Sequence, residues 1–146
     1  RFLGLHALEC FQKNHFGYRR AMNAIAVFIG GGLGSLLRYQ FGLHVLKLGW
    51  MTPWGTLLAN TLATAILLGI LSHQSTLDPS TKWGGAFMLL LTTGFCGGFS
   101  TFSAFSADTL QLAQTHGFTW AIGNVACNLI LCLAAGWWSW SAFQAS

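Results

Sequence analysis

The chain has 146 residues, of which 53% are hydrophobic and only 7% carry a formal charge. A soluble domain usually has about 25% charged residues, and so few charges cannot cover a water-facing surface. Lipid is therefore the expected solvent, and we expect an all-α, multi-pass integral protein of the cell membrane. The net charge of +4 does not indicate a nucleic-acid partner, because the cations are not clustered on one folded face.

The amino-terminal segment, residues 1–21, differs from the rest because it holds Arg1, Lys13, Arg19 and Arg20. It has no apolar core followed by a cleavage site, so it does not predict a signal peptide. We expect residues 22–146 to form the membrane domain and residues 1–21 to be an extension outside the fold. The alternative is a short interfacial helix that uses the apolar side chains of Phe2, Leu5, Leu8 and Phe11.

Four segments have the roughly 20 mostly apolar residues that a membrane-spanning helix needs. They run from about Met22 to Leu46, from about Pro53 to Ser72, from near Trp83 past Asp108, and from about Phe118 to Trp140. Short polar connections separate them. Tryptophans, which favour the membrane interface, sit near the expected ends: Trp50, Trp54, Trp83, Trp120 and Trp137. The sequence therefore predicts one membrane domain.

The distribution of cations gives the domain little preference for either orientation. After Met22, Lys47 lies in the first connection and Lys82 lies in the second, on opposite faces of the membrane. The cation bias that normally decides orientation is nearly absent. Such a chain could insert both ways and pair antiparallel, although Lys13, Arg19 and Arg20 would draw the amino terminus to the cytoplasm.

The third span carries an unusual run of glycines and hydroxyl residues between Thr93 and Ser106. Gly97 and Gly98 would let the helix break, and the freed carbonyls would suit a small hard cation. Alternatively, these small residues serve close helix packing. Phe102 and Phe105 share a face, and their positive ring edges could contact an anion or simply pack against lipid and protein.

Polar residues four apart recur in the second and fourth spans. Thr56 and Asn60 share one face, as do Asn124 and Asn128. An amide inside a membrane is costly unless it is paired. Asn60 therefore either forms a hydrogen bond between helices or donates to an anion.

The first span contains five small or apolar residues, Gly30-Gly31-Gly32-Leu33-Gly34. No Lys-Ser/Thr follows, so nucleotide binding is excluded, and Gly30 and Gly34 form a small-xxx-small packing pair. Arg38 follows one turn later. It either reaches the interface or supplies positive potential to a vestibule.

Reactive side chains are sparse, so catalysis has little support. The spans contain no Glu, and Asp78 and Asp108 fall at expected helix ends. The histidines of this region lie at or near connections: His44, His73 and His116. The cysteines lack CxxC spacing and are expected to act as small packing residues: Cys10, Cys96, Cys127 and Cys132.

Three motifs together resemble the Fluc fluoride channel family, also called CrcB. They are Gly-Gly-Gly-Leu-Gly-Ser-Leu-Leu-Arg-Tyr (30–39), Gly-Thr-Leu-Leu-Ala-Asn (55–60) and Gly-Phe-Cys-Gly-Gly-Phe-Ser-Thr-Phe-Ser-Ala-Phe-Ser (94–106). The likeness runs from Met22 to about Trp138. It implies four transmembrane helices per subunit, a broken third helix and an antiparallel, dual-topology homodimer. It also implies two pores for passive fluoride export and a structural sodium ion at the dimer centre.

The resemblance also implies roles for individual residues. The fluoride path would be formed by Asn60, Phe102, Phe105 and Thr56. Asn124 and Asn128 would be possible members of a polar track.

The same motifs imply two further roles. This sequence also differs from the family's usual residues at two positions. The backbone carbonyls of Gly97 and Ser100, from both subunits, would hold the sodium, and Arg38 would be the vestibule arginine. Ser100 replaces the usual Thr, which is harmless if only its carbonyl binds. Ala104 replaces another usual Thr, so a hydroxyl contact is missing there.

Two other classes remain as alternatives. A small four-helix drug/proton exporter would need a membrane carboxylate, and the first three spans have no Glu. A non-transporting membrane assembly subunit would tolerate Asn60→Ala without a transport phenotype.

Overall fold

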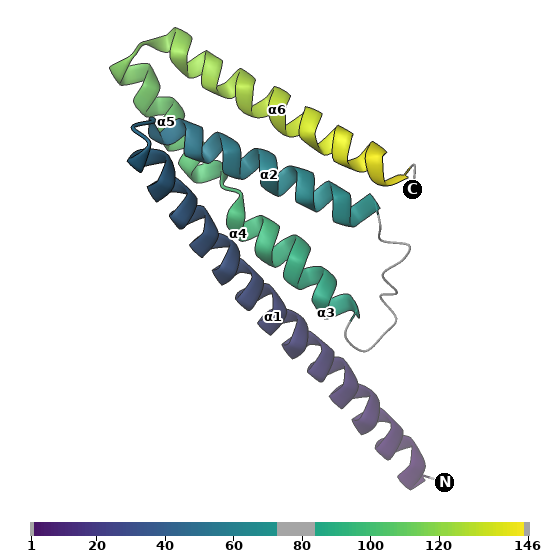
Figure 1. Ribbon diagram of the computed structural model, residues 1–146. Coiled ribbons are helices and arrows are strands. Elements are labelled where there is room, and N and C mark those ends of the chain that lie inside the picture. The colour runs from purple at the N-terminus through teal and green to yellow at the C-terminus, as the bar shows by residue number, and fades with distance from the viewer. Residues whose placement is uncertain (1, 73–83, 145–146) are drawn as a thin grey trace.

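The computed structural model describes the backbone of residues 2–72 and 84–144, and the side chains of residues 18–72 and 84–143. All regular elements in this part of the chain are helical (Figure 1). In chain order they are α1 (Phe2–Lys47), α2 (Thr52–Ser72), α3 (Gly84–Leu89), the π-helix η1 (Leu90–Cys96), α4 (Gly97–Phe99), α5 (Phe102–Thr115) and α6 (Phe118–Gln144).

Four stretches are long and apolar enough to cross a membrane, which confirms the predicted all-α architecture with four spans. They are Tyr18–Lys47, Thr52–Ser72, Gly84–Thr115 and Phe118–Phe143. Met22 lies inside the continuous helix α1 rather than at its start. The division between residues 1–21 and 22–146 stays a prediction. Asp78, His73, Lys82, Trp83 and the second connection lie outside the described residues, and so does the side chain of Cys10.

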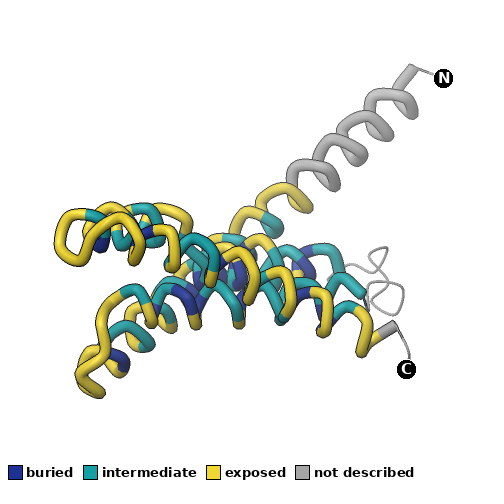
Figure 2. Tube along the Cα trace, turned by 90° about the horizontal axis from the view of Figure 1, so that it is seen from above, coloured by how far each residue is buried: buried dark blue, intermediate teal, exposed yellow. Residues whose placement is uncertain are grey.

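The outer surface is largely apolar, as a lipid-facing surface must be. Buried positions follow the contacts between helices, and exposed positions dominate the rest of the tube (Figure 2). Large side chains such as Phe28 and Trp137 are 82% and 75% exposed. The surface of a single chain is therefore suited to lipid or to another membrane protein.

Glycines with positive φ make the two short turns. Gly49 (φ 75°) follows α1, and its N–H donates to Leu46 O at 3.0 Å. Gly117 (φ 93°) separates α5 from α6. A left-handed residue after a helix end is the usual glycine C-cap arrangement. Both turns lie at the same end of the bundle (Figure 1).

Glycines also bring α1 into close contact with the third span. A Cβ atom on Gly30 would collide with Leu90 O, and one on Gly34 would collide with Phe95 O. From the other side, Gly98 lies against the backbone of Gly31. The expected small-xxx-small pair therefore faces the third span, as close backbone approach requires.

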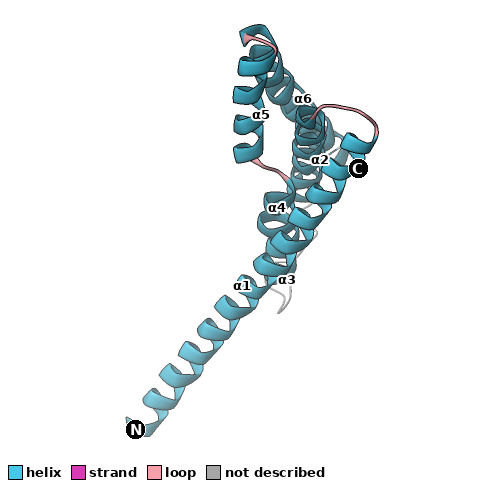
Figure 3. Ribbon diagram, turned by 90° about the vertical axis from the view of Figure 1, so that its left-hand side faces the viewer, coloured by secondary structure: helices cyan, strands magenta, loops and turns pink. Residues whose placement is uncertain are grey.

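The third span has two consecutive extended residues between α4 and α5 (Figure 3). Ser100 has φ −76° and ψ 157°, and Thr101 has φ −154° and ψ 120°. Gly97, where helix breaking was expected, keeps helical angles of φ −65° and ψ −37°. The extended residues thus lie beyond the glycine pair, where the Thr101 hydroxyl caps α5 by accepting from Ala104 N–H at 3.2 Å.

Phe99 forms the centre of the small protein core, just before the extended residues. It is 2% exposed and lies with Ala59 and Ala63 of α2. Its ring is 6.0 Å from that of Phe41 and 5.9 Å from that of Phe95, measured between centroids. This packing fixes the end of α4 against α1 and α2.

Candidate functional site

The site starts where α2 meets the extended residues of the third span. Thr101 N–H donates to Asn60 Oδ1 at 2.8 Å, and Asn60 Nδ2 donates to Thr101 O at 3.4 Å. Two extended residues leave backbone groups without helical partners, and in a lipid-facing protein such groups must be satisfied by protein. Asn60 does this with both ends of its amide, so the interhelical hydrogen bond considered from the sequence is present.

A chain of amides continues from Asn60 into α6. Asn60 Nδ2 donates to Asn128 Oδ1 at 3.3 Å, and Asn128 Nδ2 donates to Asn124 O and Oδ1 at 3.1 and 3.2 Å. Asn124 Nδ2 then donates to Thr109 Oγ1 at 2.8 Å, and the Thr109 hydroxyl donates to Phe105 O at 2.7 Å. The structure therefore joins the two predicted amide pairs in one network, and adds Thr109.

Asp108 is a member of the site that sequence reasoning misplaced. It was expected at a helix end, but it lies inside α5 and accepts from Thr56 Oγ1 at 2.6 Å. Hydrogen bonds to a carboxylate are short and strong. The available signal was a charge inside an apolar span, which is a functional indication by itself. Asp108 was interpreted as an end residue, although the third span was expected to continue past it.

Arg38 and Asp108 line the same hollow, which has a volume of about 250 Å³. Thr56 and Thr101 contribute to its wall. Within the described residues, Arg38 Nε is buried and has no hydrogen-bond partner. A buried donor without a partner is costly, and this donor belongs to a residue that lines the hollow. The structure thus brings the candidate vestibule arginine beside Thr56 of the candidate path.

The two candidate path aromatics lie next to each other at the start of α5. The ring centroids of Phe102 and Phe105 are 5.7 Å apart, with 48° between the planes. Phe102 is 80% exposed, whereas Phe105 is partly covered. Each ring can present its positive edge to an anion, but one chain alone leaves Phe102 open on its outer side.

The carbonyls of Gly97 and Ser100 fit a small hard cation. In an unbroken helix they would accept from Thr101 N–H and Ala104 N–H. Those N–H groups donate instead to Asn60 Oδ1 and to Thr101 Oγ1. Both residues line a hollow of about 480 Å³ that also includes Thr92 and Thr93. Oxygen ligands of this kind suit sodium-like ions.

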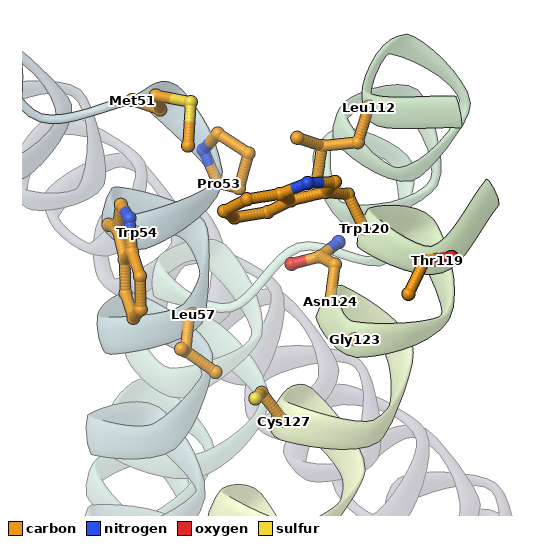
Figure 4. Close-up of a pocket in the computed structure, with 10 residues that line it drawn as sticks. All are labelled: Met51, Pro53, Trp54, Leu57, Leu112, Thr119, Trp120, Gly123, Asn124 and Cys127. Atoms are coloured by element: carbon orange, nitrogen blue, oxygen red, sulfur yellow. The ribbon is translucent and has the colours of Figure 1, made fainter. Parts of the chain in front are cut away.

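An apolar hollow of about 220 Å³ lies between α2, α5 and α6. Trp54 and Trp120 stand on opposite sides of it, and the Asn124 amide points toward the Trp120 indole (Figure 4). Cys127 is exposed at its wall, whereas Cys96 is buried in the protein. The last amide of the network, Asn124, therefore lies beside an apolar hollow.

The family described as CrcB-like protein, Camphor Resistance (CrcB), matches residues 25–140 of this chain. A relative from Serratia proteamaculans (strain 568), named fluoride-specific ion channel FluC, is 44% identical over 108 residues, which cover 72% of this chain and 80% of the relative. Proteins of the same name from Escherichia fergusonii and Escherichia coli K12 are 40% and 41% identical. The alignments cover 84% and 83% of this chain, and 96% and 95% of those relatives.

The match spans the four helices and contains every motif on which the resemblance was based. The chain is therefore a multi-pass membrane protein that belongs to the CrcB family.

Proposed function

We propose that this chain is a fluoride channel that lets fluoride leave the cell passively and so lowers its cytoplasmic concentration. The observation that carries this proposal is the Asn60 amide, which binds Thr101 directly before the α5 turn that carries the paired rings of Phe102 and Phe105. Neutral donors and ring edges at membrane depth suit a small anion. The names of the relatives point to the same ion.

Fluoride holds water tightly, so a pore must replace that water with donors and still release the ion. The two Asn60 Nδ2 contacts, 3.3 Å to Asn128 and 3.4 Å to Thr101, are long for hydrogen bonds. A fluoride ion can compete for these protons. The Asp108 carboxylate at Thr56 repels an anion and opposes tight retention.

Conduction of this kind needs no catalytic group, and we expect no enzymatic activity.

Two chains would be needed to complete the path. Phe102 is 80% exposed, and an aromatic wall of a pore must be closed on its outer side. We propose an antiparallel, dual-topology homodimer, in which the third span acts as a broken membrane helix. The near balance of Lys47 and Lys82 supports insertion in both orientations.

The same arrangement would place the hollows around Gly97 and Ser100 of two subunits together. The backbone carbonyls of these residues, freed from their usual helical donors, would hold a structural sodium. The ion would supply a fixed positive charge and would join the subunits.

Fluoride efflux from proteoliposomes tests the function and the path separately. Asn60→Asp replaces a donor by a negative charge, and Phe105→Ile removes a ring edge. Each should lower the fluoride flux by at least about ten-fold. Ser141→Ala, at an exposed hydroxyl bonded within α6, serves as a control with unchanged flux. A native chain that conducts no better than empty vesicles contradicts the function. Native flux in both site variants contradicts only the path.

A drug/proton exporter is distinguished in the same vesicles. Asp108 supplies a membrane carboxylate that such an exporter would need, so the absence of Glu does not by itself exclude this class. Exchange driven by a pH gradient, with fluoride flux absent, would favour the exporter. The CrcB family match favours the channel.

A further inference from the structure

A second polar hollow adjoins the proposed fluoride path at Asp108. It has a volume of about 250 Å³ and lies at the end of the bundle that carries both short turns. Along α5, Asp108, Gln111 and Thr115 follow the spacing of one helix face, and His116 caps the helix. The opposite wall is formed by Thr52 and Pro53, at the start of α2, and by Met51, which precedes this helix.

Two neighbours hold His116 at the edge of this hollow. The Thr115 hydroxyl donates to Gln111 O at 2.8 Å and lies 2.7 Å from His116 Nδ1. This contact is compatible with a protonated imidazolium, in which both ring nitrogens are donors. Trp120 lies against the imidazole, with 5.9 Å between ring centroids.

Asp108 links this hollow to the path. The Asp108 and Thr52 side chains line both this hollow and the hollow that contains Arg38 and Thr56. Thr56, whose hydroxyl donates to Asp108, lines the hollow that contains Arg38. Asp108 is therefore a negative charge on the boundary between the two hollows.

We propose that the His116 hollow is a mouth of the fluoride path, and that protonation of His116 increases its attraction for the anion. This inference rests on the proposed fluoride channel. Among the described residues that line the mouth, Asp108 and His116 are the titratable ones. The neighbouring Met51, Thr52, Pro53 and Trp120 carry no ionisable group.

The direction of the effect follows from the charges. Histidine is the side chain that ordinarily changes charge between about pH 5 and pH 8, and a protonated imidazole at position 116 adds a positive charge to the same α5 wall that carries Asp108. The mouth becomes less repulsive to fluoride, and the flux rises. A single charge acting through water over about 8 Å changes the local ion concentration by roughly two-fold. Salt weakens the effect, because the distance is close to the Debye length.

Three versions of the full chain test this mouth in proteoliposomes: native, His116→Gln and His116→Arg. Fluoride efflux is measured at about pH 8 and about pH 6, and the leak of empty vesicles at the same pH is subtracted. Native flux should rise about two-fold on acidification at low salt, and this rise should shrink in about 0.3 M salt. His116→Gln should stay at the native pH 8 level, and His116→Arg should stay at the higher level at both pH values.

The outcomes separate the two proposals. A native pH response that persists in His116→Gln overturns the mouth and leaves the channel standing. The same holds if all three proteins conduct equally at every pH and salt concentration. If the native chain does not conduct fluoride at all, the proposed function and this inference both fail. A merely structural histidine would lower flux in both variants, because Gln and Arg would then be equally disruptive.

Discussion

At the scale of single residues, the site depends on polar groups that hold one another in place. Thr56 donates to Asp108, and Asn60 binds both the N–H and the carbonyl of Thr101. Uncharged donors therefore surround the proposed path. The only carboxylate on this path within the described residues, Asp108, is neutralised in part by a hydroxyl rather than by an ion pair.

Thr56→Val tests the hydrogen bond to Asp108. Valine has a similar shape but cannot donate, so the carboxylate loses its 2.6 Å partner. A charged group without this bond costs about 1–3 kcal/mol, and fluoride flux should fall by roughly ten-fold. Thr56→Ser keeps the donor and should keep most of the flux. Equal flux in the Val and Ser variants would show that the hydroxyl is unimportant.

Sequence alone predicted which of these residues share a helix face, because the spacing of four residues fixes that geometry. It did not predict their partners. Asn60 finds Thr101 and Asn128 only because α2 packs between the third span and α6. The role of Asp108 was missed because this residue was interpreted as lying at a helix end rather than as a charge inside the third span.

At the scale of elements, α1 and the third span approach so closely that glycine is needed at several contacts. The four apolar segments were predictable because length and hydropathy decide membrane insertion. The position of the extended residues was not predictable from glycine content. It is determined by the Asn60 amide on another helix and by the Thr101 cap, which together make Ser100 and Thr101 the stable place for the interruption.

Gly34→Ala tests this close contact. The added methyl group would meet Phe95 O, and the overpacking should destabilise the fold by about 1–3 kcal/mol. Gly32→Ala is the matched control, because a Cβ there meets nothing within 4 Å. This control should be neutral or slightly stabilising, since alanine favours helix. Thermal unfolding in detergent measures both variants. A Gly34→Ala protein as stable as the Gly32→Ala protein would contradict the packing.

At the scale of the whole molecule, the described chain has two features that a second subunit could complete. Phe102 is open on one side, and Gly97 is exposed in the hollow that α2 and the third span form around Ser100. These features have different chemistry, one aromatic and one made of carbonyls, but a second copy of the chain could complete both. In an antiparallel pair each membrane face would receive one His116 mouth, so the pH response should be present on both sides.

The last prediction concerns orientation. Leu48 follows α1 and is 69% exposed, so Leu48→Cys, which keeps Lys47, in a chain whose own cysteines are replaced by alanine or serine would report which side that end faces. In a chain that starts at Met22, an impermeant thiol reagent should label about half of the molecules in intact cells, because the remaining cations are nearly balanced. With residues 1–21 present, Lys13, Arg19 and Arg20 should hold the amino terminus in the cytoplasm. Lys47 follows one span and would then face outward, so labelling should approach completion. Replacing Lys13, Arg19 and Arg20 by Gln should restore the half-labelled result. Equal labelling of all three chains would show that these cations do not decide orientation, and full or absent labelling of the Met22 chain would contradict the antiparallel pair.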